Sequence, residues 1–219
     1  MIIEIDDAGT GCPLGGAVIG ALKERIFKYT VIPVSVFKDG TPRELLSRNI
    51  IEAINYLLNA IHFDPEEDEI RICRGSFFKP AFRFFDDKGW NWTPVKINSK
   101  LQDLIEASFD FHLVELGVPR FLVKRLIHYR DYVVELLKWV ALKPEEREEL
   151  VKTSFNVWKN EWRYTKLEFA KKLLNRRRYC IECGLDIEKG RELVEVKFIT
   201  PRRVLRGYLH IDCWKKLER

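Results

Sequence analysis

Four residues near one end of the chain have the types and the spacing of a metal site. Two residues separate Cys180 from Cys183, two separate His210 from Cys213, and 26 residues lie between the pairs. Thiolate and imidazole are ligands that zinc prefers, and four of them complete its tetrahedral shell. Because no position stays open for water or a substrate, we expect a structural zinc ion rather than a catalytic one.

The residues around these ligands predict how the chain surrounds the ion. Gly184 can adopt the left-handed conformation that a turn after the first pair requires. Residues 192–199 and 204–209 can pair as a hairpin across Pro201, and a short helix over 210–217 then begins at the second pair. This order of knuckle, hairpin and helix is the treble-clef arrangement. Metal binding supplies much of the folding free energy of such a small module.

The same segment resembles a zinc finger of the poly(ADP-ribose) polymerase type. The residues that carry the resemblance are Cys180-Ile-Glu-Cys183-Gly, Ile187-Glu-Lys-Gly190 and Tyr208-Leu-His210-Ile-Asp-Cys213-Trp214. The resemblance implies that the two cysteine and histidine pairs bind zinc and that the module binds DNA.

Two adjacent acids, Asp6 and Asp7, end an apolar stretch and precede a glycine-rich turn. Mg²⁺ takes oxygen ligands, and two such ions about 4 Å apart can activate water and stabilise a leaving oxygen. Side chains of adjacent strand residues point to opposite faces, so both acids reach one ion only where the strand ends. The alternative interpretation is a polar strand end before a turn.

The stretch around these acids resembles the opening of type-2 ribonucleases H. The matching residues are Ile5-Asp6-Asp7-Ala8-Gly9-Thr10-Gly11 and Gly15-Gly16-Ala17-Val18-Ile19-Gly20. The resemblance implies a ribonuclease H-like fold and phosphodiester hydrolysis with Mg²⁺ or Mn²⁺, with Asp6 and Asp7 as the first two metal-binding acids.

The family has two further acids, and here the chain departs from its pattern. The third should follow a later central strand, yet the strand expected over 69–73 leads into Arg74 with no carboxylate. The fourth should come from a helix, where the candidates are Glu106 and Asp110, which share one helix face. Both can also be ordinary solvent-facing residues.

These departures leave three interpretations open. The first is a metal-dependent nuclease with a zinc finger that grips nucleic acid. The second is a non-catalytic nucleic-acid-binding or adaptor protein on a degenerate nuclease fold, in which Arg74 neutralises Asp6. The third is a protein–protein interaction module, since treble clefs serve that role too.

The predicted architecture is α/β: a ribonuclease H-like mixed sheet with helices over 1–142, a helical connector over 143–178 and the zinc module over 179–219. In the first part we expect strands over 2–6, 14–22 and 29–37, a helix to about 61, a strand over 69–73, and a hairpin of 82–85 with 90–97. Helices should follow over 101–116, over 120–142, and from Pro144 as far as Arg178.

The positive charge is concentrated at the zinc end. The chain carries a net charge of +5, and residues 171–219 hold 14 Lys and Arg against 7 Asp and Glu. This excess predicts a polyanionic partner, DNA or RNA, although a solvated basic tail is the alternative. The arginines expected to contact phosphates are Arg176, Arg177, Arg178, Arg202, Arg203 and Arg206.

Other features exclude several classes of protein. No stretch approaches the roughly 18 consecutive apolar residues of a membrane helix, so we expect no membrane partner. The opening MIIEIDD lacks the basic region and apolar run of a signal peptide. Three of five cysteines clustered with a histidine indicate a metal site in a reducing compartment, and we therefore expect a cytoplasmic protein.

Overall fold

The structure is a computed structural model that describes residues 1–124 and 129–217. The chain divides into two compact units, Met1–Leu113 and Val114–Arg219. The sequence interpretation placed the end of the first unit later, at residue 142.

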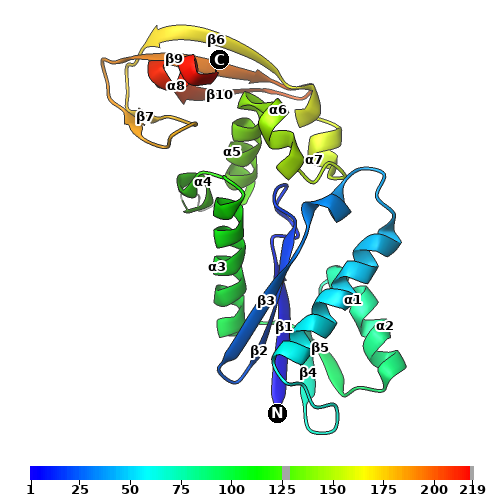
Figure 1. Cartoon of the computed structure of the whole chain (residues 1–219). Coiled ribbons are helices and arrows are strands. Elements are labelled where there is room, and N and C mark those ends of the chain that lie inside the picture. Colours follow the sequence, from blue (N-terminus) through cyan, green and yellow to red (C-terminus); the bar gives the residue numbers. More distant parts are fainter. Residues whose placement is uncertain (125–128, 218–219) are drawn as a thin grey trace. The chain divides into compact units, whose positions relative to one another are not determined.

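A five-stranded mixed sheet organises the described N-terminal unit, in the spatial order β3-β2-β1-β4-β5 (Figure 1). Its strands are β1 (Ile2–Ala8), β2 (Ala17–Lys23), β3 (Ile26–Ile32), β4 (Glu69–Cys73) and β5 (Trp92–Val95). β1 to β3 form an antiparallel meander, whereas β4 runs parallel to both β1 and β5. The prediction of a mixed α/β sheet is therefore confirmed, and β1 lies at its centre.

Helices cover both faces of this sheet (Figure 1). They are α1 (Arg43–Ala60), α2 (Lys79–Lys88) and α3 (Lys100–Glu115), with the short 3₁₀ helices η1 (Val34–Phe37) and η2 (Ser76–Phe78). α1 and α2 pack on the face where Ile3 and Ile5 are buried. α3 covers the other face, where a Cβ at Gly20 would lie only 2.2 Å from the Ile105 side chain.

The hairpin predicted around residues 86–89 is wrong. Residues 82–85 lie inside α2, which begins beside Pro80 and buries Ala81 and Phe85, four positions apart, against the core. Gly89 has φ of +66° and ends the helix, since its N–H donates to the Asp86 carbonyl at 3.0 Å. A helix C-cap and a hairpin turn both require such a glycine, so the residue types alone fitted either structure.

The described part of the C-terminal unit contains two small antiparallel sheets. The larger has the order β10-β9-β6, and the smaller pairs β7 with β8. The strands are β6 (Lys166–Leu173), β7 (Arg178–Tyr179), β8 (Asp186–Ile187), β9 (Glu192–Ile199) and β10 (Val204–Leu209). The predicted hairpin of 192–199 with 204–209 is confirmed.

The helices of this unit are mostly short. They are α4 (Arg120–Lys124), α5 (Tyr129–Leu142), α6 (Pro144–Arg147), η3 (Glu148–Leu150), α7 (Asn156–Lys159), η4 (Trp162–Tyr164) and α8 (Ile211–Leu217). None of the helices in the described ranges combines the length and the apolar character that a membrane-crossing segment needs.

A buried arginine explains why α5 belongs to the C-terminal unit. Arg147 donates to the Trp139 carbonyl at 2.6 Å, and its guanidinium lies 4.1 Å from the centre of the Trp139 ring. The same guanidinium forms an ion pair of 2.7 Å with Glu182, which lies in the predicted zinc module. These contacts connect α5 to the predicted zinc module, so α5 does not pack as part of a first domain that ends at residue 142.

The helix predicted to extend to Arg178 is also wrong. It is replaced by α6, η3, α7, η4 and β6, the last of which pairs with β9 over eight residues. Leu167 and Phe169 are two residues apart along β6, the period of a strand, and the charged residues around them obscured this pattern in the sequence. Pairing with β9 therefore overrides the helical propensity of this segment.

Candidate functional site

The structure brings the four predicted zinc ligands together in the C-terminal unit. The sulfur atoms of Cys180, Cys183 and Cys213 and a ring nitrogen of His210 all lie within 4.8 Å of one another. The Nδ1 of His210 is 3.4 Å from the Cys183 sulfur and 4.0 Å from the Cys213 sulfur. This cluster could hold a metal ion such as zinc.

The first pair of ligands lies in a tight turn between β7 and β8. The N–H of Gly184 donates to the Cys180 carbonyl at 2.8 Å, and Gly184 has the predicted left-handed conformation, with φ of +76°. The N–H of Ile181 donates to the Tyr208 carbonyl at 2.9 Å. The turn is thus held against β10, two residues before His210.

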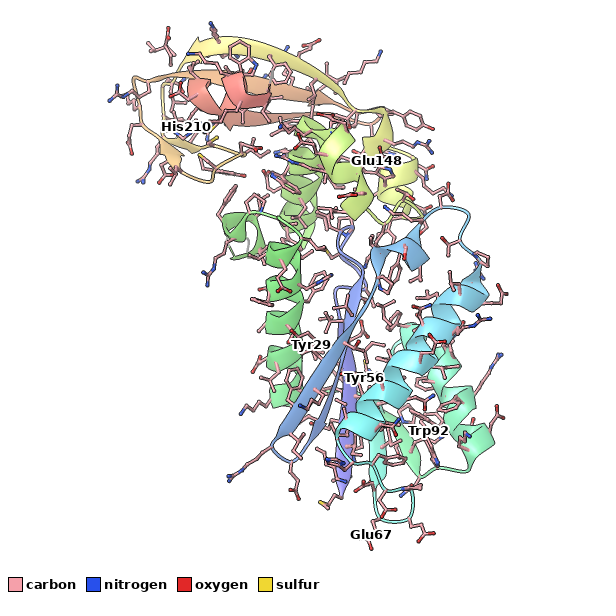
Figure 2. All side chains as sticks on the ribbon, viewed as in Figure 1. Tyr29, Tyr56, Glu67, Trp92, Glu148 and His210 are labelled. Atoms are coloured by element: carbon pink, nitrogen blue, oxygen red, sulfur yellow. The ribbon has the colours of Figure 1, made fainter. Side chains whose placement is uncertain are left out.

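The second pair lies where β10 gives way to α8. His210, labelled in Figure 2, follows the last residue of β10, and Cys213 lies in the first turn of α8. The N–H of Trp214 donates to the His210 carbonyl at 3.0 Å, so the helical turn brings Cys213 back toward the histidine.

The electrostatics of this cluster suit a cation. Burial raises the pKa of the Cys180 and Cys213 thiols, and the neighbouring sulfurs raise both further. The Nε2 of His210 lies 3.3 Å from the Asp186 carbonyl. An imidazole that donates from Nε2 to this carbonyl keeps Nδ1, which faces the sulfurs, free to bind a metal.

A second cluster forms at the C-terminal end of β1 in the other unit. Ligand atoms of Asp6, Asp7 and Cys73 lie within 4.8 Å of one another. Ile5 pairs with Ile72 in the parallel register of β1 and β4, so the next residues, Asp6 and Cys73, lie side by side. β4 ends at Cys73, so Asp7 has no strand neighbour on that side of β1, although it still pairs with Ile19 of β2 on the other side. The Asp7 carboxylate lies near the same point as Asp6 and Cys73.

The carboxyl of Asp6 is in an environment that disfavours its ionised form. Burial raises the pKa of Asp6, hydrogen bonds from the Asp7 N–H and from Cys73 oppose that rise, and the charges of Glu106 and Glu4 add to it. Burial, together with the Asp6 carboxylate, likewise raises the pKa of the Cys73 thiol to about 11. Negative charge therefore gathers here unfavourably until a cation binds.

The expectation that Arg74 neutralises Asp6 is wrong. Arg74 is exposed, and none of the described groups that shift the pKa of Asp6 is cationic. Its backbone N–H instead donates to the Val95 carbonyl at 2.9 Å, where the chain leaves β4.

The two helix acids proposed from the resemblance lie on α3 but outside this cluster. Glu106 is exposed and accepts a hydrogen bond of 3.3 Å from Gln102, although its charge still acts on Asp6. Asp110 is partly buried and, in the described structure, is not a member of the cluster. The third member of the cluster is instead Cys73, which the sequence analysis did not name as a candidate ligand.

Contacts around the glycine turn fix α3 above the end of β1. A Cβ at Gly9 would lie 2.2 Å from the Phe109 ring, so only glycine permits this approach, and its φ is +83°. His112 approaches the Gly15 carbonyl at 2.7 Å through Nε2. Thr10 donates to the Asp7 carboxylate at 2.7 Å and orients it.

The six arginines predicted to contact phosphates do not form one continuous surface. Arg203 pairs with the buried Glu161 at 2.8 Å, and Arg177 pairs with Asp186, so these two charges are compensated within the protein. For Arg176, Arg178 and Arg206, no carboxylate of the described residues serves as a partner. Arg202 is also exposed and has no carboxylate partner among the described residues, but it lies outside the surface that Arg176, Arg178 and Arg206 line together.

Comparison of the chain with models of known families, with curated proteins and with solved structures gives no match.

Proposed function

We propose that this protein binds nucleic acid through the basic surface of its C-terminal unit, which a structural zinc ion stabilises. The ligands of that ion are Cys180, Cys183, His210 and Cys213. Three thiols and one imidazole are a typical closed zinc set, which leaves no position for chemistry at the metal. The zinc ion therefore has a structural role, and function depends on the surface that it supports.

The observation that carries this proposal is the set of three uncompensated arginines on that surface. Arg178 lies on β7 and Arg206 on β10, strands that flank the zinc ligands in sequence, and Arg176 precedes β7. Guanidinium groups bind phosphate through paired N–H donors and stay charged at any ordinary pH. The resemblance to the poly(ADP-ribose) polymerase-type finger supports the same kind of partner.

Direct binding measurements test this function. Fluorescence anisotropy with labelled DNA and RNA oligonucleotides, single- and double-stranded, should give saturable binding at about 50 mM salt that weakens steeply by about 200 mM. The weakening is expected because released counterions contribute most of the free energy of binding to phosphates. Absence of binding to all four probes at low salt would reject the proposal.

A second candidate function is metal-dependent phosphodiester hydrolysis at the end of β1. The specific observation in its favour is the convergence of Asp6, Asp7 and Cys73 at a point where negative charge is unfavourable without a cation. The chain order β1-β2-β3-α1-β4 also agrees with the resemblance to type-2 ribonucleases H. Two carboxylates and one thiol fit a single divalent ion, and they fall short of the oxygen ligands that two ions need.

A cleavage assay separates the enzyme from the non-catalytic adaptor. Incubation of DNA, RNA and hybrid duplexes with the protein and Mg²⁺ or Mn²⁺ should yield cleavage that Asp6→Asn abolishes. Binding without cleavage at any metal concentration would instead assign the protein to the adaptor class.

A further inference from the structure

Two hollows lie beside each other on the basic surface of the C-terminal unit. The first has a volume of ≈ 580 Å³ and the second of ≈ 490 Å³, each within the size range of small-molecule sites. The residues common to both linings are Arg178, Arg206 and Tyr208. These three side chains therefore form the boundary between the hollows.

The register of the sheet explains how the boundary forms. Arg206 and Tyr208 are two residues apart on β10, so they share one face of the strand. Gly207 between them is buried on the other face, where a Cβ would lie 3.1 Å from the Phe198 ring. The guanidinium of Arg178 lies 5.0 Å from the centre of the Tyr208 ring, so the ring and the cation are stacked.

The charges around the hollows favour a polyanion at this boundary. Three cations in the linings are compensated by carboxylates: Lys138 by Glu135, Lys172 by Glu195 and Arg177 by Asp186. The remaining cations are Arg176, Arg178 and Arg206, which no described carboxylate pairs with. Within the two linings, the uncompensated positive charge therefore lies around the aromatic ring.

We propose that this double hollow is a binding site for single-stranded nucleic acid, with unstacked bases in the hollows beside Tyr208 and phosphates on the three arginines. The inference rests on the proposed nucleic-acid binding and specifies its substrate class. Aromatic rings combined with a cationic track are the means by which proteins bind single strands with little sequence preference. In a duplex the bases are already stacked on one another, so they cannot enter the hollows or stack on the Tyr208 ring.

The test is a comparison of affinities measured with the full chain. Labelled single-stranded oligonucleotides of DNA and RNA and the matching blunt duplexes are titrated by anisotropy, with bound zinc measured in every sample. Tyr208→Leu should weaken single-strand binding roughly 5- to 150-fold, as expected for loss of one stacked base, and leave the salt dependence unchanged. Tyr208→Phe keeps the ring and should retain the wild-type affinity for single strands.

A second tyrosine provides a matched control. Tyr164 is exposed and is also stacked with an arginine, since the Arg163 guanidinium lies 5.3 Å from its ring centre, but neither residue lines the hollows. Tyr164→Leu should leave binding unchanged. Equal affinity for single strands and duplexes, or equal losses in the two leucine variants, would overturn the inference while nucleic-acid binding itself stands. If the wild-type protein binds none of the probes, the proposed function itself is rejected.

Discussion

Cys73 is hydrogen-bonded to Asp6 across the parallel pair of β4 and β1. Cys73 is the last residue of β4, so a thiol lies just before Arg74, the position where the resemblance to type-2 ribonucleases H calls for a carboxylate. This thiol lies beside two acids that the same resemblance assigns to metal binding. We expect this difference to affect which metal ion the cluster prefers and how its variants respond to metal.

Replacement of Asp6 should stabilise the protein when the cluster holds no divalent ion. The pKa of Asp6 is raised in the folded protein. The contribution of Asp6 to the free energy of unfolding is therefore complete below its ordinary pKa of 3.8, and it is lost as the pH rises through the folded-state pKa. At neutral pH the carboxylate is therefore unfavourable, and Asp6→Asn removes that cost. The melting temperature of zinc-loaded Asp6→Asn, in buffer without Mg²⁺ or Mn²⁺, should exceed that of wild type at pH 7.

The difference in melting temperature between Asp6→Asn and wild type should shrink as the pH falls through the raised pKa of Asp6 toward its ordinary value of 3.8, because wild-type Asp6 then becomes protonated. Asp87→Asn, which changes an exposed acid of the same unit, should have little effect at either pH. A lower melting temperature for Asp6→Asn at neutral pH would contradict the account of its environment.

The thiol should also set the metal preference of the cluster. Sulfur ligands favour Mn²⁺ and Zn²⁺ over Mg²⁺, which binds oxygen almost alone. Mn²⁺ should therefore raise the melting temperature at lower concentration than Mg²⁺ does, since an ion that binds only the folded state stabilises it. Cys73→Asp should narrow the difference between the two ions, because a third carboxylate replaces the sulfur. An identical response of both proteins to both ions would show that Cys73 is not a ligand.

Breaking a buried ion pair should strongly destabilise the N-terminal unit. Lys23 lies 2.6 Å from Asp68, whose side chain is fully buried. Burial alone would raise the pKa of Asp68, but the Asp64 N–H, Lys23 and the Met1 amine outweigh it and lower that pKa. Asp68→Asn leaves Lys23 buried without its partner and should lower the free energy of unfolding by about 3–5 kcal/mol in urea titrations at pH 7.

The contribution of Asp68 is complete above its ordinary pKa of 3.8 and disappears as pH falls through the lower folded value. The difference between wild type and Asp68→Asn should therefore narrow only in that acidic range. As a control, Glu168→Gln breaks the exposed pair with Lys197 and should cost less than about 1 kcal/mol. Equal losses in the two variants would argue against a special role for burial.

Removal of one zinc ligand should unfold the C-terminal unit alone. Cys180→Ser or His210→Ala should reduce bound zinc from one equivalent to none, because a tetrahedral site with three strong ligands holds the ion far less tightly. Limited proteolysis should then digest residues beyond Leu113 and spare the N-terminal unit. Cys12→Ala, in the other unit, should keep its zinc. Elemental analysis that finds no zinc in wild type would refute the site.

The sequence predicted best where one interaction decides the structure locally. The spacing of the ligands correctly predicted that His210 and Cys213 lie in the cluster. Residue alternation and the turn at Pro201 correctly predicted β9 and β10. Prediction failed where a residue type suits two structures. Gly89 fits a helix end as well as a hairpin, and β6 becomes a strand only because β9 lies beside it.

The site residues that were missed depend on tertiary register. Nothing local marks Cys73 as a ligand, since its proximity to Asp6 arises from the parallel pairing of strands that are far apart in sequence. A signal was present, because both predicted strands end at these residues and would lie side by side in a parallel pair. The sequence analysis likewise gave Tyr208 no role of its own, although Tyr208 alternates with Arg206 on β10, two residues before His210.

The central claim, that nucleic acid binds at three uncompensated arginines, is tested most directly by the salt dependence of the dissociation constant for a single-stranded oligonucleotide. The variant carries Arg176→Gln, Arg178→Gln and Arg206→Gln. A control carries Lys189→Gln, Arg191→Gln and Arg202→Gln, an equal charge change at exposed positions outside the hollows.

We expect the slope of log affinity against log salt to flatten by about 2 in the first protein, because each lost phosphate contact contributes about 0.7. The control should keep nearly the wild-type slope and affinity. Equal slopes for both triple variants would contradict the account, since binding would then follow net charge and not this site.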